Sequence, residues 1–109
     1  MPDTYKILGQ VNPTANTLTN VYVTGTSSSA VVSTITIHNF SDANSSYSIV
    51  VRPNNESLGN KHYVIRGGII PAREMLSIMG AVTMNAGVIL AANTNGSSVS
   101  FNAYGVEIT

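Results

Sequence analysis

The two histidines are the first candidates for chemistry, because imidazole serves as a metal ligand and as an acid or base near neutral pH. His38 and His62 each fall in a predicted strand, and neither has an acidic residue at metal-ligand spacing beside it. A zinc site needs a cluster of His, Cys or carboxylate ligands. The sequence therefore predicts solvent-facing or hydrogen-bonded strand histidines and no metal site.

Carboxylates are the next candidates, since Asp42 with Glu56, or Glu74 with Glu107, would suit a glycosidase-like acid and base pair. Nothing in their spacing selects either pair, and carboxylates in loops or at strand edges are ordinarily solvated. The serines include no G-x-S-x-G elbow. Gly67-Gly68 lacks the rest of a phosphate-binding loop and indicates a tight hairpin reversal. We therefore expect no catalytic residue, no cofactor and no enzymatic activity.

Four N-x-S triplets formally match glycosylation acceptors. In a chain so rich in Asn and Ser, and with no signal peptide in MPDTYKILGQ, we interpret them as coincidental. They begin at Asn39, Asn44, Asn55 and Asn95.

The composition excludes several classes of partner. Only 9% of the 109 residues are charged, and five Lys and Arg balance five Asp and Glu, so no basic field exists for nucleic acid. No apolar run approaches the roughly 18 residues of a membrane span. The absence of cysteine fits a reducing cytoplasm. A surface made soluble by Ser, Thr and Asn has little self-repulsion, which favours a protein packed in an assembly.

Short β-patterned runs follow one another along the chain, with turn residues every 8 to 12 positions and no amphipathic helix. This pattern predicts an all-β fold: a single antiparallel β-sandwich domain over residues 1–109, of jelly-roll or Greek-key type with about eight strands. We expect residues 18–24 and 30–39 to form a hairpin, and residues 53–60 to hold one irregular helical turn. The remaining predicted strands cover residues 4–9, 46–52, 61–66, 74–79, 88–92 and 97–109. Ile69 and Ile70 lead into Pro71, which places them at a sheet edge or at a strand start.

The closing stretch, SSVSFNAYGVEIT, predicts the strand against which the others are arranged. Its apolar residues first occupy one alternating phase and then, around Gly105, the other, as in a strand that passes a bulge or changes sheets. Phe101 is predicted to lie in the core. The first phase holds Val99, Phe101 and Ala103, and the second holds Tyr104, Val106 and Ile108.

Two features indicate interaction with other chains. The segment from Ile69 to Met84 carries more apolar side chains than one face of short strands buries, so it fills the core with methionine or forms a subunit contact. Short Ser- and Thr-rich strands also carry little charge to protect sheet edges, which packing against copies of the chain would cover.

Six strand motifs resemble small capsid decoration (cement) proteins of tailed bacteriophages, over essentially the whole chain: YKILGQ, TLTNVYVT, AVVSTITIHN, SIVVRP, KHYVI and VSFNAYGVEI. The resemblance implies a jelly-roll sandwich that assembles as homotrimers on the exterior of the icosahedral head. It implies the major capsid protein as partner, synthesis in the bacterial host cytoplasm and no catalytic residue. It transfers no contact residue, so the capsid and subunit contacts are unknown at this point.

Two other functions remain open. A small tail or fibre-associated phage protein shares the composition and the assembly logic. A carbohydrate-binding module also suits a jelly roll, although the absence of tryptophan argues against an aromatic stacking platform.

Overall fold

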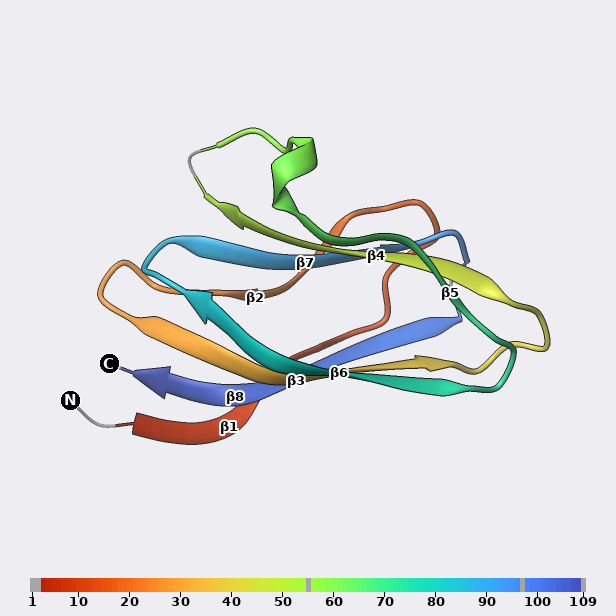
Figure 1. Cartoon of the computed structure of the whole chain (residues 1–109), viewed down its shortest axis with the longest axis horizontal. Helices are drawn as coiled ribbons and strands as arrows, with labels where there is room; N and C mark the ends of the chain where they lie inside the picture. Colours follow the sequence, from red (N-terminus) through yellow and green to blue (C-terminus); the bar gives the residue numbers. More distant parts are fainter. Residues whose placement is uncertain (1–2, 55, 97, 109) are drawn as a thin grey trace.

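Eight strands form two four-stranded antiparallel sheets that face each other (Figure 1). The computed structural model describes residues 3–54, 56–96 and 98–108, and it describes only the backbone of residues 3, 4, 80 and 81. Asn55, and the Ser97 and Thr109 ends of the predicted closing strand, lie outside the described residues. The strands are β1 (Asp3–Val11), β2 (Thr19–Val23), β3 (Ser29–Asn39), β4 (Ser45–Pro53), β5 (Tyr63–Ile70), β6 (Met75–Met84), β7 (Val88–Thr94) and β8 (Val99–Ile108).

The strand order is that of a jelly roll, which confirms the predicted fold class. The first sheet has the order β1-β8-β3-β6 and the second sheet has the order β2-β7-β4-β5. The predicted hairpin of residues 18–24 and 30–39 is wrong, because β2 pairs with β7 while β3 pairs with β6 and β8. The alternating pattern showed that each strand has one buried face, but it did not show which strand lies beside it. The loop between β2 and β3 is long enough to reach the facing sheet, about 10 Å away, so the two strands lie in different sheets.

The core lies between the sheets, where the alternating residues of both inner faces meet. Phe101 is fully buried, as predicted, and the inward Ile35 and Ile37 of β3 are buried while His38 is exposed. The largest fully buried side chains of the core include Phe101, Ile37, Ile49, Ile70, Met84, Leu90, Val32 and Val99.

Strand β8 keeps one inward phase along its length, so the predicted change of phase is wrong. The apolar residues in the second half of β8 therefore face away from the core. The inward positions are buried and hold Val99, Phe101, Ala103 and Gly105. The outward positions in that half are partly exposed and hold Tyr104, Val106 and Ile108.

The irregularities lie in the two neighbours of β8. Register shifts leave one extra residue in β1, at Leu8, and one in β3, at Ser33. The bulged β3 backbone comes so close that a Cβ on Gly105 would lie 2.1 Å from the carbonyl oxygen of Val31. Only glycine fits this inward position, and this explains the apparent change of phase in the sequence.

Gly67-Gly68 is not a reversal, because β5 continues through both glycines. Gly67 has a φ of +72°, and the register with β4 shows one extra residue of β5 in this region. A Cβ on Gly68 would lie 2.7 Å from the Tyr47 ring. Gly67 therefore permits a bulge, and Gly68 leaves room for the Tyr47 ring. A Gly-Gly pair is also typical of a tight turn, so the sequence alone does not distinguish the two.

A 3-10 turn, η1 (Asn60–His62), lies in the β4–β5 connection above the outer face of the second sheet (Figure 1). One helical turn was expected slightly earlier, and the strand predicted from Lys61 begins at Tyr63. Below this connection lies a second small cluster of Val50, Ile89 and Ala91, with Leu18 and Tyr63 packed against it. The outer face of the second sheet is thus partly covered by its own chain.

Candidate interaction surface

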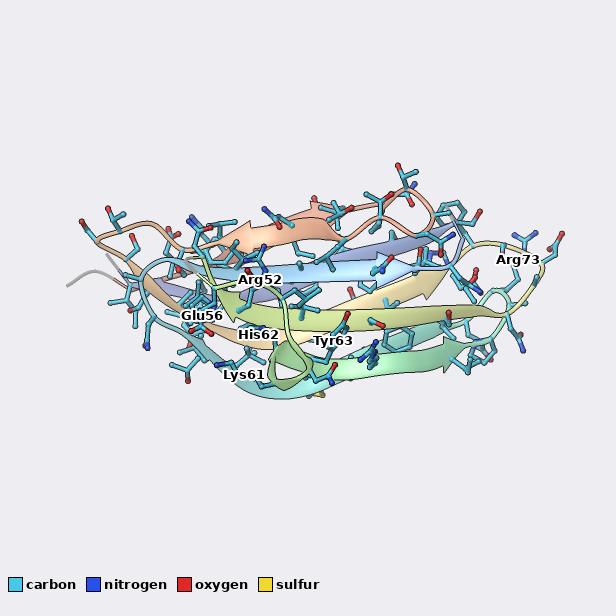
Figure 2. The ribbon with its side chains drawn as sticks, turned by 90° about the horizontal axis from the view of Figure 1, so that it is seen from above. Arg52, Glu56, Lys61, His62, Tyr63 and Arg73 are labelled. Atoms are coloured by element: carbon cyan, nitrogen blue, oxygen red, sulfur yellow. The ribbon has the colours of Figure 1, made fainter. Side chains whose placement is uncertain are left out.

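The two histidines occupy unrelated places. His38 is exposed on β3, with its ring centroid 6.0 Å from that of Phe40. His62 is buried in η1 rather than in a strand; its Nδ1 accepts a hydrogen bond of 2.9 Å from the Gly59 N–H. Its Nε2 therefore carries the ring hydrogen and faces Glu56 Oε1 at 3.4 Å (Figure 2). His62 therefore bonds to other residues of its own connection between β4 and β5. The described residues contain no group of three or more His, Cys, Asp or Glu placed to hold a metal ion.

The first carboxylate pair considered from the sequence is not brought together. Asp42 Oδ1 lies 2.6 Å from Arg73 Nη2, and Glu56 Oε1 lies 3.0 Å from Lys61 Nζ. Arg73 and Glu56 lie near opposite ends of the molecule (Figure 2). Each carboxylate is thus held by its own basic partner.

The second pair is separated in the same way. Glu74 precedes β6, whose first residue Met75 is opposite His38, whereas Glu107 is near the end of β8, whose Ile108 is opposite Ser29. These are the two ends of the first sheet. Neither carboxylate pair can flank one substrate bond as an acid and base must.

Glu107, near the end of β8, links the two sheets. Its Oε1 accepts a hydrogen bond of 2.8 Å from Lys6 Nζ, and its Oε2 accepts one of 2.5 Å from the Tyr22 hydroxyl. The bonds from Lys6 and then Tyr22 hold the pKa of Glu107 below its usual range. Burial, followed by the Glu107 carboxylate, raises the pKa of Tyr22 from 10.0 to about 12.

Tyr22→Phe is expected to remove part of the alkaline loss of stability. A phenol whose pKa is raised by folding stabilises the native state fully below its unfolded pKa and loses that effect as the pH rises through its folded pKa, here from 10.0 to about 12. The free energy of unfolding, from urea titrations between about pH 8 and about pH 12, should fall less steeply in the variant. Tyr63→Phe, which leaves the Tyr22–Glu107 bond in place, should follow the wild type. Equal slopes for all three proteins would contradict this account of Tyr22.

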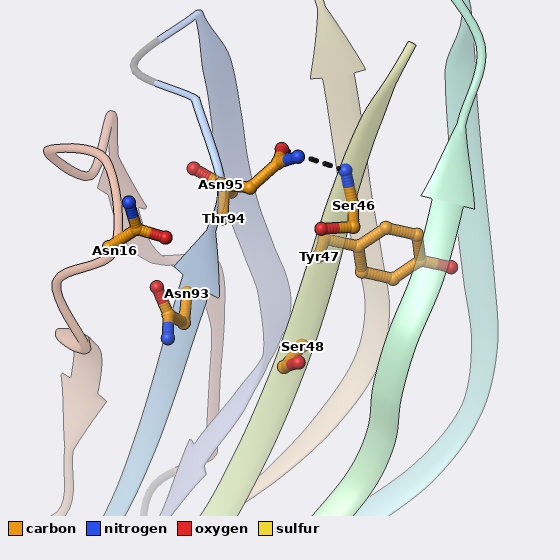
Figure 3. A pocket seen from close by; sticks show the side chains of 7 residues that line it. All are labelled: Asn16, Ser46, Tyr47, Ser48, Asn93, Thr94 and Asn95. Carbon is orange, nitrogen blue, oxygen red and sulfur yellow. Dashed lines mark hydrogen bonds between the residues drawn. The ribbon is translucent and has the colours of Figure 1, made fainter.

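A polar hollow of about 100 Å³ lies beside the ends of β4 and β7 (Figure 3). Carboxamides and hydroxyls line it. One of the carboxamide oxygens, Asn95 Oδ1, already accepts a hydrogen bond of 2.9 Å from the Ser46 N–H. The only ring in the lining belongs to Tyr47, whose side chain is buried. The hollow therefore has no aromatic platform on which a sugar would stack. Its lining is Asn16, Ser46, Tyr47, Ser48, Asn93, Thr94 and Asn95.

The asparagines of the N-x-S triplets differ in their surroundings. Asn39 is fully buried, and its side-chain amide donates to the backbone oxygens of Ala43, Ile70 and Pro71 at 2.8, 3.1 and 3.2 Å. Such an amide is a structural clamp rather than an acceptor of a glycan. Asn44 and Asn95 are exposed.

Part of the apolar segment from Ile69 to Met84 fills the core, and part of it is exposed. Ile70 and Met84 are fully buried in the core, whereas Ile69, Met75 and Met79 are exposed. Tyr5 and Ile7 of the predicted first strand, now β1, are exposed as well. Alternation in a sequence indicates an apolar face of a strand but not the direction in which that face points. Ile69 lies on β5 of the second sheet. The other four exposed side chains lie on the outer face of the first sheet, which is therefore the candidate interaction surface.

The chain is an antiparallel jelly-roll sandwich with one sheet face rich in exposed apolar side chains. The described part of the chain has no helix with the length and hydropathy needed to cross a bilayer.

The comparisons with known proteins concern the fold. No protein-family model and no curated protein matches the chain. A chain in the acidic stable capsid structure of Helicobacter pylori bacteriophage KHP30 is similar over 99% of this chain and 92% of its own length, with a TM-score of 0.53 and 9% identity. A pentameric capsid protein from metagenomic phage sequences aligns with 98% of this chain and 62% of its own, with a TM-score of 0.31 and 16% identity. At 9% identity the first likeness shows a shared fold.

Proposed function

We propose that this chain is a structural virion protein, a decoration (cement) protein that binds the exterior of a tailed-phage head as a homotrimer. The observation that carries the proposal is the fold, which is similar over nearly the full length of both chains to a chain in a phage capsid structure. The strand motifs that resemble decoration proteins support the same role. The scattered, ion-paired carboxylates support a role in binding rather than in catalysis.

The proposed mechanism adds binding free energy only to the assembled shell. Each trimer contacts neighbouring major capsid subunits at once, so it stabilises the lattice in which those subunits are adjacent. A single contact is weak, but several contacts from one trimer act together through their high effective concentration. The protein is made in the host cytoplasm and resides on the capsid exterior.

Co-sedimentation with phage heads tests this function. We expect saturable binding to expanded heads that lack the protein, much weaker binding to unexpanded heads, and a higher temperature of DNA release from decorated heads. Purified tails serve as the control. Binding to tails in place of heads would overturn the proposal and favour a tail or fibre role.

A further inference from the structure

The outer face of the first sheet, here called the neutral face, presents several exposed apolar side chains. Strand register places Ile7, Tyr104, Thr34 and Met79 in one row across all four strands, and Tyr5, Val106 and Val31 in the next. Tyr5 is 83% exposed, Ile7 53% and Met79 79%. Large apolar side chains gathered in adjacent rows ordinarily mark a contact with another protein.

Among the side chains that the structure describes, the neutral face carries no Lys, Arg, Asp or Glu. The ion pairs lie elsewhere: Glu56–Lys61 in the β4–β5 connection, Asp42–Arg73 at one end, and Glu107–Lys6 on the inward phase at the other. The histidine on this face, His38, lies in the row opposite Met75 and away from the apolar rows. The polar side chains on this face are Ser, Thr, Asn and Gln.

The absence of charge restricts what can cover this face. A partner that buried a charged group here would lose its hydration and gain no counter-charge, which is costly. A partner surface of the same neutral, Tyr- and Met-containing kind carries no such penalty, and those residue types are enriched at interfaces. The chain itself supplies such a surface. Around a symmetry axis, equivalent residues approach one another, and among the described side chains of this face that approach brings no like charges together.

We infer that copies of this chain contact one another through the neutral face, with Tyr5, Ile7 and Met79 at the contact. The inference rests on the homotrimer of the proposed function and assigns the face that lines its threefold axis. The surfaces left for the capsid are then the second sheet, with its charged β4–β5 connection, and the two ends of the sandwich.

Sedimentation equilibrium of the purified chain tests this inference without phage heads. We expect the wild type to have three times the mass of one chain, and Ile7→Asp to weaken the association more than about tenfold. Val64→Asp is the matched control, since Val64 is 49% exposed on β5 of the other sheet and should keep the wild-type mass. Because Ile7 points into solvent in the single chain, Ile7→Asp should retain the cooperative thermal unfolding of an intact fold.

A wild type that stays monomeric up to about millimolar concentration would overturn the inference. So would an Ile7→Asp protein that unfolds cooperatively and keeps the wild-type mass. If a monomeric wild type binds heads and Ile7→Asp abolishes that binding, the capsid covers the neutral face, and the inference is wrong while the proposed function stands. If the wild type is a trimer through this face but does not bind phage heads, the proposed function is wrong while the inferred contact stands.

Discussion

Phe101→Ala is expected to lower the free energy of unfolding by about 3 to 5 kcal/mol, the usual range for a buried phenylalanine. Phe101 is fully buried near the start of β8, opposite Ile37 of β3 on one side and Val11 of β1 on the other. Truncation loses the transfer free energy of the ring and leaves a cavity that the two paired strands cannot close. Domains of this size have a total stability of about 5 to 15 kcal/mol, so the variant should be close to unfolding at room temperature.

Urea denaturation followed by circular dichroism measures this effect. The matched control is Asn102→Ala, on the same strand and directed outward, which should shift the free energy of unfolding by less than about 1 kcal/mol. Phe101→Ala with the wild-type midpoint would show that the inward face of β8 has been assigned incorrectly.

Asn39→Ala is expected to cost about 3 kcal/mol or more, because it leaves several buried or partly buried polar groups without their hydrogen-bond partner. The amide donates to three backbone oxygens, and Oδ1 accepts from the Ser41 N–H at 3.0 Å and from the Ser41 hydroxyl at 2.8 Å. These bonds tie the end of β3 to the β3–β4 loop and to the end of β5. Each partner left without its bond loses on the order of 1 to 3 kcal/mol unless water enters.

Thermal and urea unfolding of Asn39→Ala should be compared with those of Asn44→Ala. Asn44 is exposed, and its Oδ1 accepts one bond of 3.1 Å from the Ala72 N–H, so its loss should cost less than about 1 kcal/mol. Asn39→Asp is a second probe, because it retains an acceptor for Ser41 but places a carboxylate against three carbonyl oxygens. Equal stability of the Asn39 and Asn44 variants would contradict the clamp.

The alternation of apolar residues was sufficient to predict the sandwich and much of its core. The run around Ile35 and Ile37 and the first half of β8 each have one buried face, and burial follows the pattern. The pairing of strands could not be predicted in the same way, since alternation does not specify the neighbour. A jelly roll places β2 and β3 in different sheets, although their short connection favours a hairpin.

The candidate surface was only partly predictable. The excess of apolar residues between Ile69 and Met84 left both core filling and a subunit contact open. Three of these residues are exposed, and two of the three, Met75 and Met79, lie on the candidate surface. The second apolar phase of β8 was attributed to a bulge in that strand or to a change of sheets, whereas the bulges are in β1 and β3 and Gly105 keeps the inward phase. The close β3 backbone leaves only a glycine in the sequence of β8, and a glycine does not tell a bulge in its own strand from one in a neighbour, so the direction of Tyr104 could come only from the structure.

The central claim is that this protein decorates the outside of a phage head, and a cryo-electron microscopy map of the particle tests it most directly. Heads carrying the wild-type chain should show threefold density on the outer surface, each lobe matching one jelly-roll sandwich and spanning neighbouring capsid subunits. Heads without the chain should lack that density alone. Jelly-roll density found on the tail, or no difference between the two kinds of head, would contradict the claim.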